Sequence, residues 1–470
     1  MIQVREKLLL QSFLSGYDGL KKIKGKVDRL SYERLSIDSR TIEPGELFLA
    51  LHGENHDGHA YIPQVVQKGA SGAIVEKSWY NAHPDEIPSD FPLVVVENTL
   101  HFLQQLAAWH RRQFEIPVIG ITGSNGKTTT REMTAHVLSR RYRVFRNEGN
   151  KNNHIGVPLM LLQLREDHEV AVFEMASNHA GEIALLAGLT QPTMGVVTNI
   201  GKAHLGYFGS LHDVYKEKTA LFEAIPATAP IVINMEDPLL RSYPRENRRV
   251  ITVGYSSDYD VFGKIVSHNK LGAIRFLLNN RVQVSLQIPG AHQLLNALIA
   301  SAVALEMGLS EDEIADALAS FQPASQRMEI KEMNGVTIIN DAYNANPDSM
   351  RKAVDYLTSL KTGDGKKILI LGDMLELGAF SEDEHRELGR YIAEKDGLSE
   401  VLLYGPDSRF IKEGIKSVKA KKLKCYHYPR HLDITRHLRQ ILHPGDVLLL
   451  KGSRGMQMER VLYGLFEQEA

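Results

Sequence analysis

The residues best suited to chemistry stand in one short run, TGSNGKTTT, at residues 122–130. Apolar, β-branched residues precede it and helix formers follow it, so the local order is strand, glycine loop, helix. Backbone N–H groups at the start of a helix lack intrahelical partners and attract anionic oxygens. In such a loop Gly123 and Gly126 let the backbone approach a phosphate, Lys127 supplies a cation, and Thr128 offers Mg²⁺ a hydroxyl. The run predicts a nucleotide-phosphate site, with a plain glycine turn as the alternative.

Two polar residues follow later apolar strands. Glu174 ends VAVFE, and His204 comes shortly after GVVTNI. Ligands of parallel sheets bind at the carboxyl ends of the strands, so Glu174 is a candidate Mg²⁺ ligand and His204 a candidate metal or phosphate contact. The alternatives are a solvated or capping glutamate and one ordinary histidine among 19.

A lysine lies on the apolar face of a predicted helix, DVYKEKTALFEAI. The apolar stripe consists of Val214, Leu221, Phe222 and Ile225, and Lys218 falls on it whereas Lys216 does not. An inward lysine is costly unless it is paired, neutral or modified. Snorkelling of the ammonium group to the surface is the alternative.

The last third of the chain offers further polar turns. NDAYNANPDSM lies between a strand and a helix that begins near Pro347, where nucleotides often bind, although Asn and Asp also simply favour turns. Arg327 stands at a predicted domain junction and either leans over a phosphate or is an exposed hinge residue. Lys451 and Arg454, in KGSRGMQME, are a candidate site for a carboxylate or phosphate.

The whole chain sets bounds on these readings. Its 470 residues carry 55 basic and 57 acidic side chains, a net charge of −2, which gives no electrostatic argument for nucleic acid or an anionic membrane. The single cysteine, Cys425, fits a reducing cytoplasm and is expected to be an apolar filler. No run reaches the ~18 apolar residues of a membrane helix. The short run LLLQSFL, at residues 8–14, lacks a cleavage pattern, so we expect a cytoplasmic protein without a signal peptide.

Three α/β segments are predicted. Residues 1–113 mix short strands, helices and turns, residues 114–320 carry the glycine loop in a mostly parallel sheet, and residues 321–470 restart the pattern as a Rossmann-like domain. Within the second segment, residues 250–288 alternate like strands around Asn279 and Asn280 and predict a β-hairpin appendage.

The ordered set of motifs resembles the Mur ligase family, ATP-dependent amide-forming enzymes of peptidoglycan synthesis. The common phosphate loop has a glycine where this chain has Ile121, and the shorter TGSNGKTTT is that family's own version. Further matching stretches span nearly the whole chain: DSRTIEPGELFLALHGENHDGHAYI, GNKNNHIGVPLMLL, FEMASNHAGEI, TNIGKAHLGYFGS, HQLLNALIA, RMEI, NDAYNANPDSM, LGDMLELG and KGSRGMQME. The resemblance implies a three-domain architecture, with a UDP-sugar-binding domain, a central ATP-binding domain and a C-terminal Rossmann-like domain.

The resemblance also implies roles for individual residues. Lys127, Lys218, His204 and Arg327 would be catalytic, and Lys218 would be carbamylated by CO₂ so that it holds a second Mg²⁺ with His204, while Thr128 and Glu174 hold the first. ATP would contact Thr122, Gly123, Ser124, Asn125, Gly126, Lys127, Thr128, Thr129, Asn296, Arg327, Asp341, Tyr343, Asn344 and Asn346. The UDP-sugar substrate would contact Asp38, Ser39, Arg40, Asn152 and Asn153. Lys451 and Arg454 would be further substrate contacts.

The reaction implied by the resemblance is the joining of D-Ala-D-Ala to UDP-N-acetylmuramoyl-tripeptide. The tripeptide carboxylate attacks the γ-phosphate of ATP, and the dipeptide amine then displaces phosphate from the acyl phosphate. Such a monomeric enzyme would serve cell-wall biogenesis, and through it cell shape and division. The alternatives are another Mur-type ligase, a folylpolyglutamate-type ligase and a non-enzymatic nucleotide-binding regulator. The sequence leaves open whether the tripeptide ends in lysine or diaminopimelate.

Overall fold

The computed structural model describes residues 10–27, 30–53, 56–83, 87–418 and 423–466. The run LLLQSFL therefore begins outside the described residues. The chain divides into two compact units. The first comprises Met1–Ile116, Asn147–Glu169 and Leu185–Gln191, and the second comprises Pro117–Arg146, Val170–Ala184 and Pro192–Ala470.

The first unit contains a five-stranded sheet in the order β1-β5-β4-β3-β2, in which β1 runs antiparallel to β5 and the other neighbours are parallel. The strands are β1 (Leu20–Lys24), β2 (Leu35–Ser36), β3 (Leu47–Leu49), β4 (Gly72–Glu76) and β5 (Leu93–Val96). The helices are α2 (Leu10–Leu14), η1 (Gly58–Tyr61), α3 (Ile62–Gln67), α4 (Lys77–Ala82), α5 (Thr99–Arg111) and α7 (Gly156–Leu161). Strands β3, β4 and β5 are almost wholly buried, because they are apolar and central.

The second unit opens with a nine-stranded sheet in the order β14-β13-β12-β11-β10-β9-β6-β8-β7. Its strands are β6 (Val118–Thr122), β7 (Val144–Arg146), β8 (Val170–Glu174), β9 (Met194–Val197), β10 (Ile231–Asn234), β11 (Val250–Gly254), β12 (Val261–His268), β13 (Ala273–Leu278) and β14 (Val282–Pro289). The associated helices are α6 (Lys127–Leu138), α8 (Glu182–Thr190, shared between the units), α9 (Leu205–Phe208), α10 (Leu211–Glu223), α11 (Pro238–Arg241), α12 (Gln293–Glu306) and α13 (Glu311–Ser320). The predicted order of strand, glycine loop and helix is confirmed by β6 and α6.

The predicted hairpin around Asn279 and Asn280 is present between β13 and β14, and both asparagines have positive φ values of 50° and 57°. The expectation that it forms an appendage is wrong. Strand β11 pairs in parallel with β10, and β12 continues the sheet from β11, so the hairpin extends the central sheet.

The C-terminal part of this unit is a six-stranded sheet in the order β15-β16-β20-β17-β18-β19, parallel except for β15. Its strands are β15 (Glu329–Met333), β16 (Val336–Asp341), β17 (Lys367–Gly372), β18 (Glu400–Tyr404), β19 (Lys424–Tyr428) and β20 (Val447–Lys451). Its helices are α14 (Pro347–Ser359), η2 (Gly378–Phe380), α15 (Ser381–Glu394), α16 (Ser408–Ser417), α17 (His431–Ile441), η3 (Arg454–Met456) and α18 (Arg460–Phe466).

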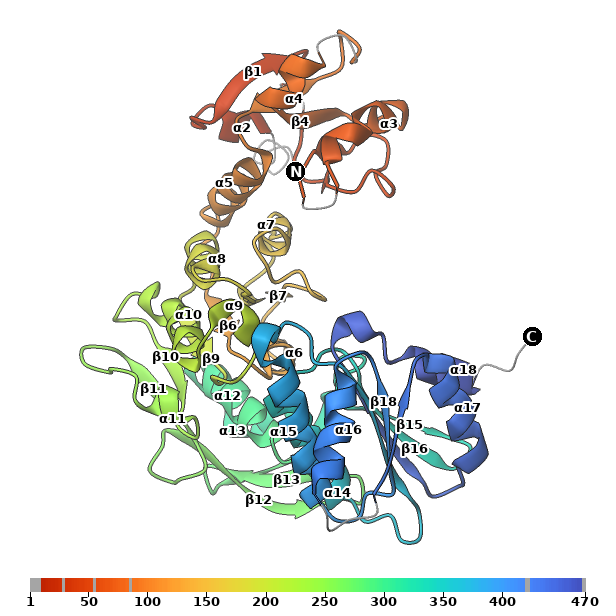
Figure 1. Cartoon of the computed structure of the whole chain (residues 1–470). Helices are drawn as coiled ribbons and strands as arrows, with labels where there is room; N and C mark the ends of the chain where they lie inside the picture. Colours follow the sequence, from red (N-terminus) through yellow and green to blue (C-terminus); the bar gives the residue numbers. More distant parts are fainter. Residues whose placement is uncertain (1–9, 28–29, 54–55, 84–86, 419–422, 467–470) are drawn as a thin grey trace. The chain divides into compact units, whose positions relative to one another are not determined.

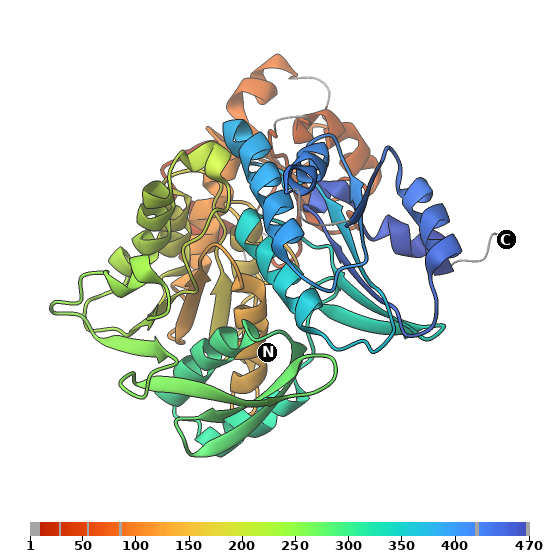
Figure 2. The same cartoon turned by 60° about the horizontal axis from the view of Figure 1, so that its bottom comes forward.

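Both faces of this sheet are covered by helices. Along β17, Leu369 and Leu371 belong to a core with α14, α15 and α16, whereas Ile368 and Ile370 belong to a core with α17 and α18. The alternation follows from the two-residue period of a strand. Figures 1 and 2 show α14–α16 together on one side of the sheet and α17 with α18 on the other.

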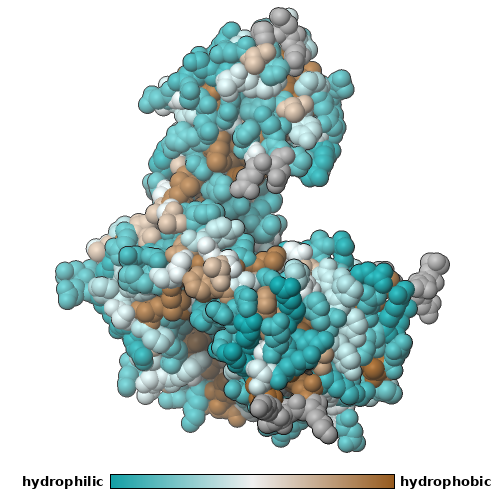
Figure 3. Space-filling view, viewed as in Figure 1, coloured by the Kyte–Doolittle hydropathy of each residue, from teal (hydrophilic) through white to brown (hydrophobic). Residues whose placement is uncertain are grey.

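Helix α15 shows how these helices are patterned. It buries Leu388 and Ile392 and exposes Glu382, Asp383 and Glu387. The surface over α15 is accordingly strongly hydrophilic in Figure 3. In the described ranges, no helix combines the length and apolar character needed to cross a bilayer.

Candidate active site

The glycine loop lies between β6 and α6, and its two glycines are required by the fold itself. Gly123 and Gly126 have φ values of 137° and 79°. A Cβ atom on Gly123 would lie 2.1 Å from Thr198 Oγ1, and one on Gly126 would lie 2.6 Å from Asn296 Oδ1. Besides leaving room for a ligand, these glycines let β9 and α12 pack closely behind the loop.

Lys127 is the first residue of α6, and its Nζ donates to Gly123 O at 2.7 Å and to Ser124 O at 3.3 Å. Burial lowers the pKa of Lys127, the Glu174 carboxylate opposes this shift, and the Arg327 cation adds to it. The structure thus places Lys127 in the electrostatic field of two other predicted site residues.

Glu174 ends β8, directly beside Ile121 of β6 in the parallel register. Its side chain is 2% exposed, so the solvated alternative is wrong. Its Oε2 lies 3.3 Å from Nη1 of the equally buried Arg131, a residue to which the sequence gave no role. Thr128 is also buried. The hydroxyl of Thr128 and the carboxylate of Glu174 are hard oxygen donors of the kind that Mg²⁺ prefers.

Lys218 lies in α10 and is 1% exposed, whereas Lys216 is exposed. The inward prediction is confirmed, and snorkelling is wrong. Lys218 Nζ donates to Ser177 Oγ at 2.6 Å and lies 5.6 Å from the Phe208 ring centroid. Burial, and then the positive charge of Lys127, lower the pKa of Lys218 to about 7, against the opposing charges of Glu217 and Glu182.

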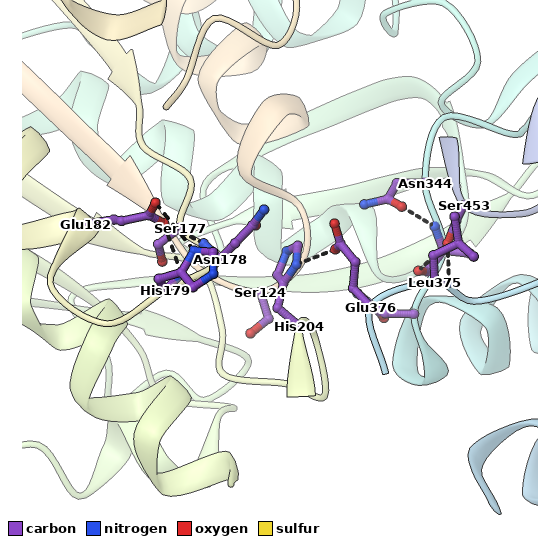
Figure 4. A network of polar contacts seen from close by, with 12 residues as sticks. Ser124, Ser177, Asn178, His179, Glu182, His204, Asn344, Leu375, Glu376 and Ser453 are labelled. Carbon is purple, nitrogen blue, oxygen red and sulfur yellow. Dashed lines mark hydrogen bonds and ion pairs between the residues drawn. The ribbon is translucent and has the colours of Figure 1, made fainter. Parts of the chain in front are cut away.

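His204 precedes α9 in the left-handed region, with φ 56°. Its Nδ1 lies 2.5 Å from Oε2 of Glu376, which comes from the C-terminal sheet's side of the unit (Figure 4). The imidazole holds the pKa of Glu376 below its usual value. In the described ranges no group of three or more His, Cys, Asp or Glu side chains is arranged to hold a metal ion, so any metal here needs a ligand from another source.

The polar turn after β16 contacts the glycine loop. Asn346 caps α14, and its Nδ2 donates to Asn125 Oδ1 at 2.8 Å. Asn125 is further held by Asn199, whose Oδ1 accepts from the Asn125 backbone N–H at 3.0 Å. Asn296 lies behind the loop in α12, where its Oδ1 accepts from Thr130 Oγ1 at 3.3 Å. Asn199 and Asn346, which are far apart in the sequence, therefore both contact Asn125.

Other predicted nucleotide residues gather around β16. Asp341 Oδ2 lies 2.5 Å from Nζ of Lys451, which also donates to Asn344 O at 3.0 Å. Arg327 is half-buried, and its guanidinium lies 3.8 Å from the centroid of the Tyr343 ring, so it is not a freely exposed hinge residue.

Arg454 is more open than Lys451, with a side chain that is 58% exposed. Its Nη1 donates to Glu459 Oε1 at 2.7 Å and to Gln326 Oε1 at 2.8 Å. Both acceptors belong to the same unit, so Arg454 is oriented by its neighbours before any ligand binds.

Comparison with known proteins shows which family the chain resembles. The sequence matches the Mur ligase middle domain over residues 121–304, the Mur ligase glutamate ligase domain over residues 326–454, and the Mur ligase family catalytic domain over residues 31–111. The chain belongs to the Mur ligase family. It also has the three-domain α/β architecture of that family, and each of its three sheets is built from one of the three segments predicted from the sequence.

Several similar proteins of known name are ligases of one kind. The UDP-N-acetylmuramoyl-tripeptide–D-alanyl-D-alanine ligase of Bacillus subtilis is 35% identical over 95% of this chain and 96% of its own. The ligase of that name from Escherichia coli is 34% identical over 93% and 94%. A crystal structure of MurF from Acinetobacter baumannii superposes with a TM-score of 0.84 at 33% identity, covering 94% of this chain and 95% of its own. MurF of Thermotoga maritima in complex with ADP gives 0.81 at 29% identity, covering 92% and 97%.

The residues predicted to bind the UDP-sugar lie in the first unit. Arg40 is paired with Asp38, and the Arg40 side chain lowers the pKa of Asp38 to about 2. Ser39 is buried, and its carbonyl oxygen accepts from Lys68 Nζ at 2.7 Å. Asn153 Oδ1 accepts from the backbone of Gly156 at 2.8 Å, at the start of α7. The backbone N–H of Asn152 donates to Asn150 O at 2.8 Å. Their roles in substrate binding stay predictions.

Sequence reasoning missed Glu376, Arg131 and Ser177. Arg131 stands one helical turn after Lys127, a spacing that points to the same side of α6 and was available as a signal. Ser177 lies in the loop that follows Glu174, the last residue of β8. Glu376 lies in the motif LGDMLELG, but no local pattern indicates that its partner is His204, which is far away in the sequence.

Proposed function

We propose that this chain is an ATP-dependent ligase that joins D-Ala-D-Ala to UDP-N-acetylmuramoyl-tripeptide and forms the nucleotide-linked pentapeptide of peptidoglycan synthesis. The observation that carries the proposal is the similarity, over more than nine-tenths of both chains, to two UDP-N-acetylmuramoyl-tripeptide–D-alanyl-D-alanine ligases. The phosphate loop and the buried Lys218 add chemical support. A folylpolyglutamate-type ligase or a regulator that only binds nucleotide receives no support from these relatives.

The chain's own residues account for the phosphoryl transfer. The loop N–H groups and Lys127 bind the triphosphate of ATP, with Thr122–Thr129 around it. Asn296 would contact adenine, and Asp341, Tyr343, Asn344 and Asn346 of the C-terminal domain would close on the nucleotide. Arg327, held on Tyr343, adds positive charge near Lys127. Magnesium ions, when bound, neutralise charge on the transferring phosphoryl group. Thr128 and Glu174 would hold one of them.

Lys218 would become a ligand for a second Mg²⁺ after modification. Its neutral amine forms an N–C bond with CO₂ and releases one proton, which leaves a carbamate anion. The apolar surroundings and the Ser177 hydroxyl fit this role, because burial disfavours the ammonium form and a carbamate oxygen can accept from Ser177. His204 would share the metal with this carbamate. Within the part of the chain that the structure describes, no group of three or more His, Cys, Asp or Glu side chains is arranged to hold a metal, so the carbamate would add an anionic ligand beside His204.

The tripeptide substrate would contact Ser39, Arg40, Asn152 and Asn153, and the dipeptide would contact Lys451 and Arg454. The tripeptide carboxylate attacks the γ-phosphorus and the bond to the β,γ-bridging oxygen of ATP breaks, giving ADP and an acyl phosphate. The dipeptide amine then attacks the acyl carbon, phosphate leaves and the amine loses a proton. We expect a monomer acting in the cytoplasm.

The deciding experiment measures phosphate release by the purified chain with ATP, Mg²⁺ and lysine- or diaminopimelate-containing UDP-tripeptides. Release that requires D-Ala-D-Ala, with the UDP-linked pentapeptide detected by mass, would support the proposal and identify the tripeptide. Release that requires free glutamate, lysine or diaminopimelate and ignores D-Ala-D-Ala would contradict it.

A further inference from the structure

The turn that carries His204 is in close contact with the loop that carries Glu376. Figure 4 shows the two side chains pointing toward each other, with His204 Nδ1 2.5 Å from Glu376 Oε2. The backbones also meet, because Gly206 N–H donates to Glu376 O at 3.1 Å. The contact therefore joins the central and C-terminal domains through both main chain and side chain.

Two glycines make this approach possible. A Cβ on Gly206 would lie 2.7 Å from Gly378 N and 2.9 Å from Glu376 O, and one on Gly378 would lie 3.0 Å from Gly206 Cα. All of these neighbours are backbone atoms, which have little freedom to move aside. Any side chain at Gly206 must push the Glu376 loop away from the His204 turn.

Both interacting residues have a backbone conformation that non-glycine residues rarely adopt. The φ angles of His204 and Glu376 are 56° and 65°. Such conformations persist where the surrounding structure holds them, and they cluster at functional sites. The facing pair is thus a specific arrangement of the two loops.

The chemistry of imidazole gives this arrangement a consequence. A carboxylate at Nδ1 favours the tautomer with its proton on Nδ1, which leaves the lone pair of Nε2 for a cation. Histidines that bind metals commonly present their other nitrogen to a carboxylate in this way, and the carboxylate fixes the ring and raises its basicity. We propose that Glu376 is the positioning residue of His204, so that the C-terminal domain completes the second metal site. This inference rests on the proposed metal role of His204.

Another ion pair between the same domains provides a control. Lys202 Nζ lies 2.5 Å from Glu384 Oε1, and the Lys202 side chain is 43% exposed. Lys202→Met removes this domain contact while leaving the Glu376 carboxylate in place. If Glu376 served only to hold the domains together, the two losses would have similar effects.

The test measures Mn²⁺ binding to the full chain by electron paramagnetic resonance, with Mn²⁺ replacing Mg²⁺ and with ADP and bicarbonate present. The wild type should bind two Mn²⁺ ions. Glu376→Ala should weaken the second ion about 10- to 100-fold and leave the first unchanged. Glu376→Gln, whose amide oxygen can take the place of the carboxylate oxygen beside Nδ1, should keep most of the affinity, and Lys202→Met should match the wild type. The Glu376 side chain is 39% exposed, so these variants should fold.

A backbone variant probes the same contact without altering either side chain. Gly206→Ala should weaken the second Mn²⁺ as Glu376→Ala does, whereas Gly188→Ala, at a helical glycine with no atom near the added methyl, should not. Equal Mn²⁺ affinities in wild type and Glu376→Ala, or an equal loss in Lys202→Met, would overturn the inference. A wild type that binds a single Mn²⁺ would instead remove the proposed second metal site itself.

Discussion

Two lysines, Lys127 at the start of α6 and Lys451 at the end of β20, differ in the groups that contact their ammonium nitrogens. Lys127 Nζ donates to two backbone carbonyl oxygens, which are neutral. Lys451 Nζ lies 2.5 Å from the Asp341 carboxylate and is 4% exposed. A cation held by carbonyls keeps a charge that a phosphate can neutralise, whereas a buried cation on a carboxylate is already part of an ion pair. The comparison distinguishes a lysine without a direct carboxylate partner, Lys127, from one whose charge is already paired, Lys451.

The largest expected effect is on Lys127. Lys127→Ala should lower kcat by at least about 10²–10³-fold, because it removes preorganised positive charge at the transferring phosphoryl group. The midpoint of urea unfolding should stay near that of the wild type, because the Glu174 carboxylate keeps the Arg131 guanidinium beside it. Phosphate release and urea unfolding are the measurements, and the exposed Lys331→Ala is the control. A folded Lys127→Ala enzyme with most of its turnover would contradict the phosphate-loop assignment.

Lys218 adds a third case to the comparison of Lys127 with Lys451, because it is a buried lysine that donates to a hydroxyl group, that of Ser177. Lys218→Ala should lose about 10²-fold in turnover and regain part of it with acetate or formate, because a small carboxylate can occupy the place of the carbamate. Lys216→Ala, on the exposed side of the same helix, should show neither effect.

Turnover in both bicarbonate-free and bicarbonate-containing buffer is the measurement for Lys218. The carbamate assignment fails if Lys218→Ala is fully active without an added carboxylate.

Lys451 should affect stability more than Lys127 does. Lys451→Met leaves the Asp341 carboxylate without its cation and should cost about 3 kcal/mol of folding free energy, whereas Asp341→Leu with Lys451→Met should recover much of the loss. The midpoint of urea unfolding checks both. Equal midpoints for Lys127→Ala and Lys451→Met would break the comparison.

Much of this architecture could be predicted from the sequence because its signals are local. The apolar strands β6, β8, β16, β17, β18 and β20 were predicted from their apolar runs. Helical periodicity placed Lys218 on the apolar stripe of α10, but spacing alone left snorkelling of its ammonium group to the surface open, so burial of the amine was not predicted. Strands β1, β2, β7, β15 and β19 were missed. Their sequences, such as LKKIK and KCYHY, are polar on part of their surface and pair at or near sheet edges.

Pairings between distant segments could not be predicted. The sequence offered Lys451 and Asp341 as separate ligand contacts, but folding places their charges together, so part of their role is structural. Glu376 received no role because its chemistry depends on a residue of another domain. Local sequence patterns identify helices, strands and single unusual residues. Which charged side chains pair with one another depends on how distant segments are brought together by the fold.

The smallest expected effect is on Arg454, which is intermediate between the two lysines. It is paired like Lys451, yet its side chain is 58% exposed and accessible to a ligand. A dipeptide carboxylate would compete with Glu459 for the guanidinium, so the net gain from binding is modest.

Arg454→Ala should raise the KM for D-Ala-D-Ala about tenfold and change the KM for ATP little, which marks lost binding of one substrate. Glu459→Gln should lower the KM for the dipeptide, because it frees Arg454 from its carboxylate, and Arg430→Ala, at another exposed ion pair, should change neither KM. Steady-state kinetics with each substrate varied in turn decide the matter. A KM for D-Ala-D-Ala that is unaffected by both Arg454→Ala and Glu459→Gln would show that Arg454 is committed to its partner in the fold.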